Sequence, residues 1–214
     1  MTQIESKSHQ ALKNILLHSA ISVVEKEGFA GLNVRKLASM AGCAIGMVYK
    51  IFENMDDLAI HVNAATLELI DSRMAQPMAA TDPKEAIHEL AERYIDFSRR
   101  NFHLWSMLFE HRMERDLPEW FHASIARNFR HVEQALAPWT HGDPQAAALH
   151  AKVVWAALHG ICSLSISGKL DTVGAQSASI LARHMLENYM AGLEANSEGG
   201  RSPGADGNST LQKG

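Results

Sequence analysis

The chain has 214 residues, of which 46% are hydrophobic and 21% charged, enough apolar material for one large domain or two small ones with a real core. Its two cysteines, Cys43 and Cys162, are too few and too far apart for a disulfide framework or a zinc finger. No run approaches the ~20 apolar residues of a membrane span, and the first residues have no apolar signal core. The sequence therefore predicts a soluble, cytoplasmic protein with no membrane partner.

Charge is distributed unevenly along the chain. The net charge is −4, yet residues 1–54 hold six lysines and arginines against four glutamates, a net of +2, so the remainder carries −6. A small basic module that meets phosphates, joined to an acidic body that does not, would have this asymmetry.

Apolar spacing predicts helices from the first residues onward. A stripe at helical spacing ends before Gly28 and consists of Leu12, Ile15, Leu16, Ala20, Val23 and Val24. Asn33 is placed to cap a short second helix, and Gly42 can take the positive φ of a turn. A third helix is then expected to run to about Phe52.

The rest of the chain carries equally clear helix punctuation. Asn54 is expected to cap a fourth helix that ends near Met74, and Gly168 with Asp171-Thr172 separates the last two helices, the second reaching about Leu193. From residue 196 the composition turns to Gly, Ser, Asn and Pro, which predicts a disordered tail. Three proline pairs mark further helix starts: Asp82-Pro83, Leu117-Pro118 and Asp143-Pro144. About nine helices and an all-α fold result.

The helices and glycine turn between residues 33 and 52 have the plan of a helix-turn-helix unit, whose second helix enters the major groove of DNA. Leu37 and Ala38 are expected to pack on Val48 and Phe52, with Leu58 of the fourth helix closing the triangle. Any helical bundle can contain such a corner, so this spacing alone leaves DNA binding open.

Residues 15–58 resemble the N-terminal domain of TetR-family transcriptional regulators. The matching positions are dense: Ala20, Glu27-Gly28-Phe29, Leu32 to Ala38, Ala41-Gly42, Val48-Tyr49, Phe52 and Leu58. A second element, Trp155 to Gly160 followed by Leu164 and Gly168, resembles the W-x-x-x-H-G element in the C-terminal domain of one subgroup.

The resemblance implies a division of the chain and a set of partners. Residues 1–54 would form a three-helix DNA-binding domain, residues 55–195 a larger helical ligand-binding and dimerisation domain, and residues 196–214 the tail. The partners implied are double-stranded operator DNA, a small-molecule effector and a second copy of the chain. The last two long helices, around residues 144–167 and 174–193, would form the homodimer interface.

The same resemblance assigns the DNA-facing positions: Asn33, Val34, Arg35, Lys36, Ala44, Ile45, Gly46, Met47, Tyr49 and Lys50, with Ile51 beside them. Family members usually carry a polar residue at Ala44, a small hydroxyl near Met47, a histidine at Ile51 and a lysine at Met55. These departures shift the expected readout toward thymine methyl groups and DNA shape, and they remove one phosphate anchor. For Ile45, packing within the domain is an equal alternative.

Aromatic and methionine residues are dense between Phe102 and Phe121, as in a pocket for an apolar or aromatic effector, although ordinary core packing gives the same pattern. The candidate ligand-binding residues are His103, Trp105, Met107, Glu110, Trp120, Trp155 and His159.

Two other functional classes find some support in the sequence. Glu85-x-x-His88 and Glu119-x-x-His122 are copies of the unit that di-iron helical bundles use, but each lies just after a proline at a helix start, where such side chains are usually solvated and serve the helix dipole. No other catalytic constellation emerges, so no catalytic residue, metal or cofactor is predicted. A helical interaction protein with a degenerate DNA-binding unit is the third possibility. The preferred hypothesis is a ligand-responsive DNA-binding repressor.

Overall fold

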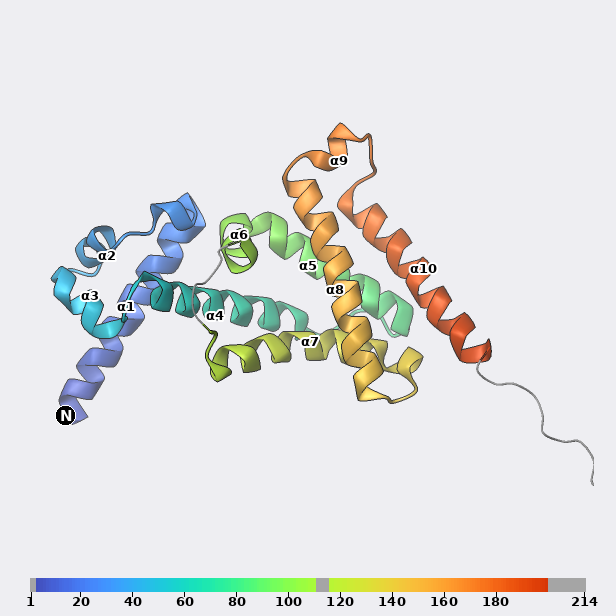
Figure 1. Ribbon diagram of the computed structural model, residues 1–214, viewed down its shortest axis with the longest axis horizontal. Coiled ribbons are helices and arrows are strands. Elements are labelled where there is room, and N and C mark those ends of the chain that lie inside the picture. The colour runs from blue at the N-terminus through green and yellow to red at the C-terminus, as the bar shows by residue number, and fades with distance from the viewer. Residues whose placement is uncertain (1–2, 111–115, 200–214) are drawn as a thin grey trace, which may run out of the picture.

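The computed structural model describes residues 3–110 and 116–199, and within these ranges it is helical throughout, with ten α-helices and one short 3-10 turn (Figure 1). The all-α prediction is confirmed. The helix that the sequence did not predict is α9 (Lys169–Thr172), a single turn in the segment that was expected only to separate the last two long helices.

Three helices form the N-terminal unit: α1 (Gln3–Glu27), α2 (Val34–Met40) and α3 (Ile45–Ile51), with the 3-10 turn η1 (Phe29–Gly31) between the first two. The Asn33 side chain caps α2 by accepting the Lys36 backbone N–H at 2.9 Å. Gly42 makes the turn before α3 with φ of 63°, a conformation that L side chains rarely adopt.

The N-terminal core is built mainly from one face of α1 and the inner faces of α2 and α3. Leu16, Ala20 and Val24 of the predicted stripe are fully buried, and they pack with Leu37, Ala38, Val48, Phe52 and Leu58. Ile15 is a correction, since 49% of it is exposed. It lies about 100° around the helix from Leu16, which places it at the outer edge of the stripe.

Helix α4 (Met55–Met74) joins the N-terminal unit to the body (Figure 1). Asn54 caps it, accepting the Asp57 N–H at 2.8 Å. Leu58, Ala59 and Val62 in its first two turns belong to the N-terminal core. Ile70 and Met74 in its last turns belong to the core of the body.

The body consists of α5 (Pro83–Arg100), α6 (Phe102–Glu110), α7 (Glu119–Thr140), α8 (Pro144–Ile166), α9 and α10 (Ala178–Gly199). Asp82 and Asp143 cap α5 and α8 as predicted, each followed by proline in the first turn. In α5 and α8 the proline is the first helical residue. In α7 the proline, Pro118, stands one position earlier and occupies the capping position. α10 continues to Gly199, past the expected end near Leu193 and into the predicted tail. Residues 200–214 of that tail lie outside the described residues.

Candidate functional site

The helix-turn-helix places α3 with one face in the core and the other in solvent. Val48 is 2% exposed and packs inward with Leu37 and Phe52. On the outer face Ala44, Gly46 and Lys50 are exposed, and Met47 is half-buried. Ile45 is 42% exposed, so its side chain faces solvent rather than packing within the domain.

The predicted cations beside this surface differ in their exposure and in whether they form an ion pair. Lys36 is half-buried and forms an ion pair with Glu27 across the turn that joins α1 and α2. Arg35 and Lys50 are exposed, and neither forms an ion pair with another residue in the part of the chain that the structure describes.

Two departures from the family pattern have a structural reason. Ile51 and Met55 are half-buried and pack against the N-terminal core. These two positions, at the end of α3 and the start of α4, therefore add apolar contact where a histidine and a lysine would reach outward.

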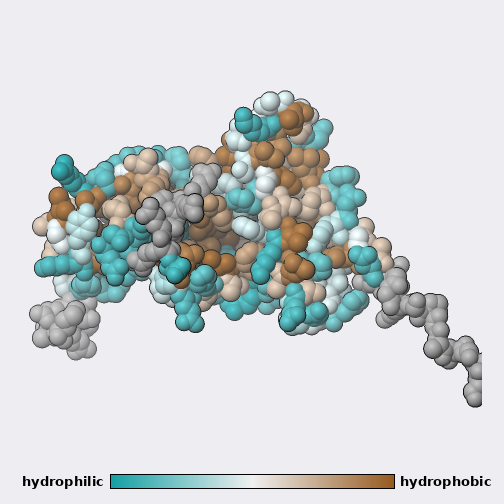
Figure 2. Space-filling model, in the orientation of Figure 1, coloured by the Kyte–Doolittle hydropathy of each residue, from teal (hydrophilic) through white to brown (hydrophobic). Residues whose placement is uncertain are grey.

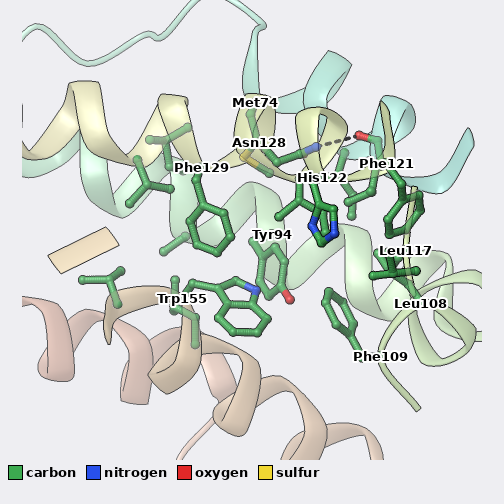
Figure 3. A pocket seen from close by; sticks show the side chains of 18 of the residues that line it. Met74, Tyr94, Leu108, Phe109, Leu117, Phe121, His122, Asn128, Phe129 and Trp155 are labelled. Carbon is green, nitrogen blue, oxygen red and sulfur yellow. Dashed lines mark hydrogen bonds between the residues drawn. The ribbon is translucent and has the colours of Figure 1, made fainter. Parts of the chain in front are cut away.

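The body contains an apolar cavity of about 750 Å³ between α4, α5, α6, α7 and α8. Five aromatic side chains surround it, and Figure 3 shows their rings converging on its centre: Tyr94, Phe109, Phe121, Phe129 and Trp155. Leucine, isoleucine, valine and methionine supply most of the remaining wall. A cavity of this size and composition has the form of a small-molecule site.

Few polar groups line the cavity, and most are engaged. The Tyr94 hydroxyl accepts the Trp105 Nε1–H at 3.1 Å and lies 3.3 Å from His159 Nδ1. Burial raises the Tyr94 pKa, so this hydroxyl stays protonated. Asn128 donates through Nδ2 to the carbonyls of Ser124 at 3.0 Å and Leu67 at 3.2 Å. Its Oδ1 is buried and accepts no hydrogen bond.

The predicted ligand-binding residues divide into three groups. Trp155 lines the cavity. His159 and Trp105 lie behind the wall, stacked with ring centroids 4.7 Å apart. The others do not line it: His103 bonds to the Glu25 carbonyl, Met107 belongs to the N-terminal core, and Trp120 stacks on His61. The side chain of Glu110 lies outside the described residues.

Sequence reasoning missed most of the wall, because it comes from the inner faces of helices far apart in the chain. The missed residues include Leu67, Ile70 and Met74 of α4, Tyr94 of α5 and Phe129 of α7. Each lies on an apolar helical stripe, and such a stripe marks a core face without distinguishing a filled core from a hollow one.

The two Glu-x-x-His units are separate and unlike each other. His88 is only 5% exposed, contrary to the expectation of a solvated side chain, because α10 packs over this part of α5. Its pKa is lowered, first by burial and then by the nearby Arg183. His122 is exposed at the rim of the apolar cavity. The described residues contain no group of three or more side chains that could hold a metal ion.

A helix-turn-helix with an exposed second helix, joined through α4 to a larger helical domain with an apolar cavity, defines a class of helical DNA-binding regulators. Comparison with known proteins agrees. Residues 87–189 match the family model described as "Tetracyclin repressor-like, C-terminal domain". No curated protein sequence matches the chain.

Solved structures share the fold over most of the chain. A protein of unknown function from Rhodococcus sp. RHA1 has a TM-score of 0.71 and 20% identity, with 85% of this chain and 94% of that one covered. The TetR family regulator PfmR from Thermus thermophilus has a TM-score of 0.55 and 17% identity, over 80% and 94%. The multidrug binding protein EbrR, complexed with imidazole, has a TM-score of 0.58 and 24% identity, over 82% and 87%.

The C-terminal match and the shared fold together identify the chain as a member of the TetR family of transcriptional regulators. It is a regulator and not an enzyme.

Proposed function

We propose that this protein is a homodimeric repressor that binds operator DNA in the cytoplasm and is released from it by a small apolar or aromatic effector. Residues 1–54 form the DNA-binding domain, residues 55–195 the ligand-binding and dimerisation domain, and residues 196–214 the tail. The mechanism is a two-state one, in which the effector binds more tightly to a conformation whose DNA-binding domains are wrongly spaced for the operator.

The observation that carries the proposal is that α4 belongs both to the N-terminal core and to the wall of the cavity. Its first turns are part of the N-terminal core, while Leu67, Ile70 and Met74 at its other end line the cavity. α6 has the same character, since Leu104 packs in the N-terminal core and Phe109 lines the cavity. A ligand that displaces either helix must therefore move the DNA-binding unit as well.

The DNA-contacting surface proposed is the outer face of α3 with the start of α2. Lys50 and Arg35 bind DNA phosphates. Asn33, Val34 and Lys36 place the start of α2 against the sugar-phosphate backbone of the DNA. The base edges and thymine methyl groups are contacted by the first residues of α3 and the residue before it: Ala44, Ile45, Gly46 and Met47. The Tyr49 hydroxyl forms a hydrogen bond to the DNA beside them. The exposure of Ile45 and Tyr49 supports this assignment, because both side chains are available to a partner.

The effector class follows from the cavity wall. Five aromatic rings and a mostly aliphatic remainder of the wall favour an apolar or aromatic molecule. A relative of the same fold, EbrR, is a multidrug binding protein, which supports an effector of this kind.

A second copy of the chain is the proposed partner of α8 and α10. Leu149, Val153 and Leu164 of α8 are exposed, and Figure 2 shows apolar side chains over the near face of the body. By length and composition α8 is also apolar enough to cross a membrane, but its opposite side packs on α5, α7 and α10. Burial of the outer stripe against a partner helix accounts for the apolar residues on both sides.

The proposal is tested by selecting bound fragments from a genomic DNA library with the purified protein at low salt, followed by fluorescence anisotropy on the recovered sequence. Saturable binding with a two-fold symmetric site is expected, with half-sites about one helical turn apart. Release of that DNA by apolar aromatic compounds would complete the assignment. Absence of saturable binding would leave a helical interaction protein as the better description.

A further inference from the structure

The cavity wall presents hydrogen-bond acceptors to a ligand but few free donors. Asn128 Nδ2 is used by two carbonyls, and its Oδ1 has no partner. Asp116, which is exposed, is the one acidic residue among the described lining residues. The described lining residues include no lysine or arginine.

Two aromatic residues of the wall, Tyr94 and His122, also carry polar groups. The Tyr94 hydroxyl accepts from Trp105 and lies 3.3 Å from His159 Nδ1, so it already has partners in the protein. His122 is exposed to solvent, and Figure 3 shows its imidazole among the side chains that line the cavity. Asn128 is thus the one described lining residue with a polar atom that is both buried and unsatisfied.

A buried acceptor without a partner is costly, and a ligand that supplies a donor removes that cost. Both carbonyls that hold Nδ2 lie inside helices, Leu67 in α4 and Ser124 in α7. Oδ1 itself is buried, so a ligand donor reaches it only when the amide turns toward the cavity. Figure 3 shows Asn128 beside the ring cluster.

We propose that Asn128 selects effectors that carry a hydroxyl or N–H donor on an apolar aromatic body over effectors that carry a carboxylate in its place. The inference rests on the proposed ligand site and names the chemical class that the site takes. A carboxylate ligand has no donor to offer Oδ1, and it would approach Asp116.

Three probes of matched size test the inference by isothermal titration calorimetry on the full chain: para-pentylphenol, para-pentylanisole and para-pentylbenzoate. The phenol is a donor, the anisole an acceptor only, and the benzoate an anion. The phenol is expected to bind roughly tenfold more tightly than the anisole, as one hydrogen bond to an otherwise unpaired acceptor provides. The benzoate is expected to bind weakest.

Variants then locate the selectivity. Asn128→Leu should reduce phenol binding to the anisole level and leave anisole binding nearly unchanged. Asn63→Leu is the matched control: its amide is also buried and unpaired, but it does not line the cavity. This control should keep the wild-type selectivity.

Equal affinity for phenol and anisole, tightest binding of the benzoate, no binding of the phenol, or selectivity that survives Asn128→Leu would each overturn the inference. These outcomes are separate from the regulator proposal, which is measured on DNA. Donor selectivity without any effect on operator binding would count against the repressor and leave the inference standing. Release of the operator by all three probes alike, with equal affinities, would support the repressor and overturn the inference about Asn128.

Discussion

Lys50 is an exposed cation at the end of α3 with no ion-pair partner among the described residues. Because Met55 packs where the family places a lysine, Lys50 and Arg35 would supply most of the phosphate-directed charge of the proposed DNA-contacting surface. Each lost phosphate contact lowers the salt dependence of binding as well as the affinity.

Lys50→Ala is therefore expected to weaken operator binding across all sequences and to reduce the slope of log K against log salt concentration by about 0.9. Anisotropy titrations at several salt concentrations measure both. Lys169→Ala, an exposed lysine on α9 of the body, serves as the control and should change neither. An unchanged slope in Lys50→Ala would remove this residue from the DNA surface.

His88 makes stability depend on pH. Its folded-state pKa lies below the ordinary value of 6.5, mainly because burial penalises the imidazolium. The unfolded chain therefore binds more protons, and stability is fully present above about pH 6.5 and falls as the pH drops below that value.

His88→Leu is expected to flatten that decline. Urea unfolding at about pH 7.5 and about pH 5 gives the free energy of unfolding of wild type and variant, and the loss between the two pH values should be smaller in the variant. His122→Leu, which removes an exposed histidine at the cavity rim, is the comparison and should keep the wild-type decline. Equal losses in His88→Leu and wild type would contradict the assignment.

Among the elements, α3 differs from its neighbours at its first residue. Asn33, Asn54, Asp82 and Asp143 each cap a helix through the side chain, whereas Ala44 at the start of α3 has no side chain that can. Helix α3 is also only seven residues long, so its stability depends on the packing of Val48 and on the turn at Gly42.

Ala44→Ser should supply the missing cap and raise the free energy of unfolding by about 1 kcal/mol. Asn54→Ala, which removes an existing cap, should lower it by a similar amount. Urea unfolding curves at fixed protein concentration measure both changes. A serine variant no more stable than wild type would show that the start of α3 is held by packing alone.

At the scale of the whole molecule, the outer stripe of α8 is the proposed contact between two copies. Val153→Glu places a carboxylate in that stripe and should convert the dimer to a monomer, since a buried unpaired charge is strongly unfavourable. Light scattering should then report the chain mass of 23.6 kDa in place of twice that value. Operator affinity should fall with it.

Leu69→Glu is the matched control for the dimer. Leu69 is an equally exposed apolar residue, 42% against 43% for Val153, but it lies on α4 and not on α8 or α10, the helices of the proposed interface. This variant should remain dimeric. A dimeric Val153→Glu protein would place the interface elsewhere on the molecule.

The sequence by itself determined the local features of this protein. The caps at Asn33 and Asn54, the turn at Gly42 and the inner face of α3 follow from propensities and spacing that act within a few residues, and the structure has them as predicted. Family membership follows from similarly local patterns of residues.

Only the tertiary structure decided which side chains enclose the cavity and which polar atoms remain unpaired. Met107 and Trp155 both fit an aromatic and methionine-rich pocket, yet one fills the N-terminal core and the other lines the cavity. Their fate depends on how five helices from distant parts of the chain pack together. The same holds for Asn128 and His88, because burial is a property of the neighbours that packing brings, and no short window of sequence contains them.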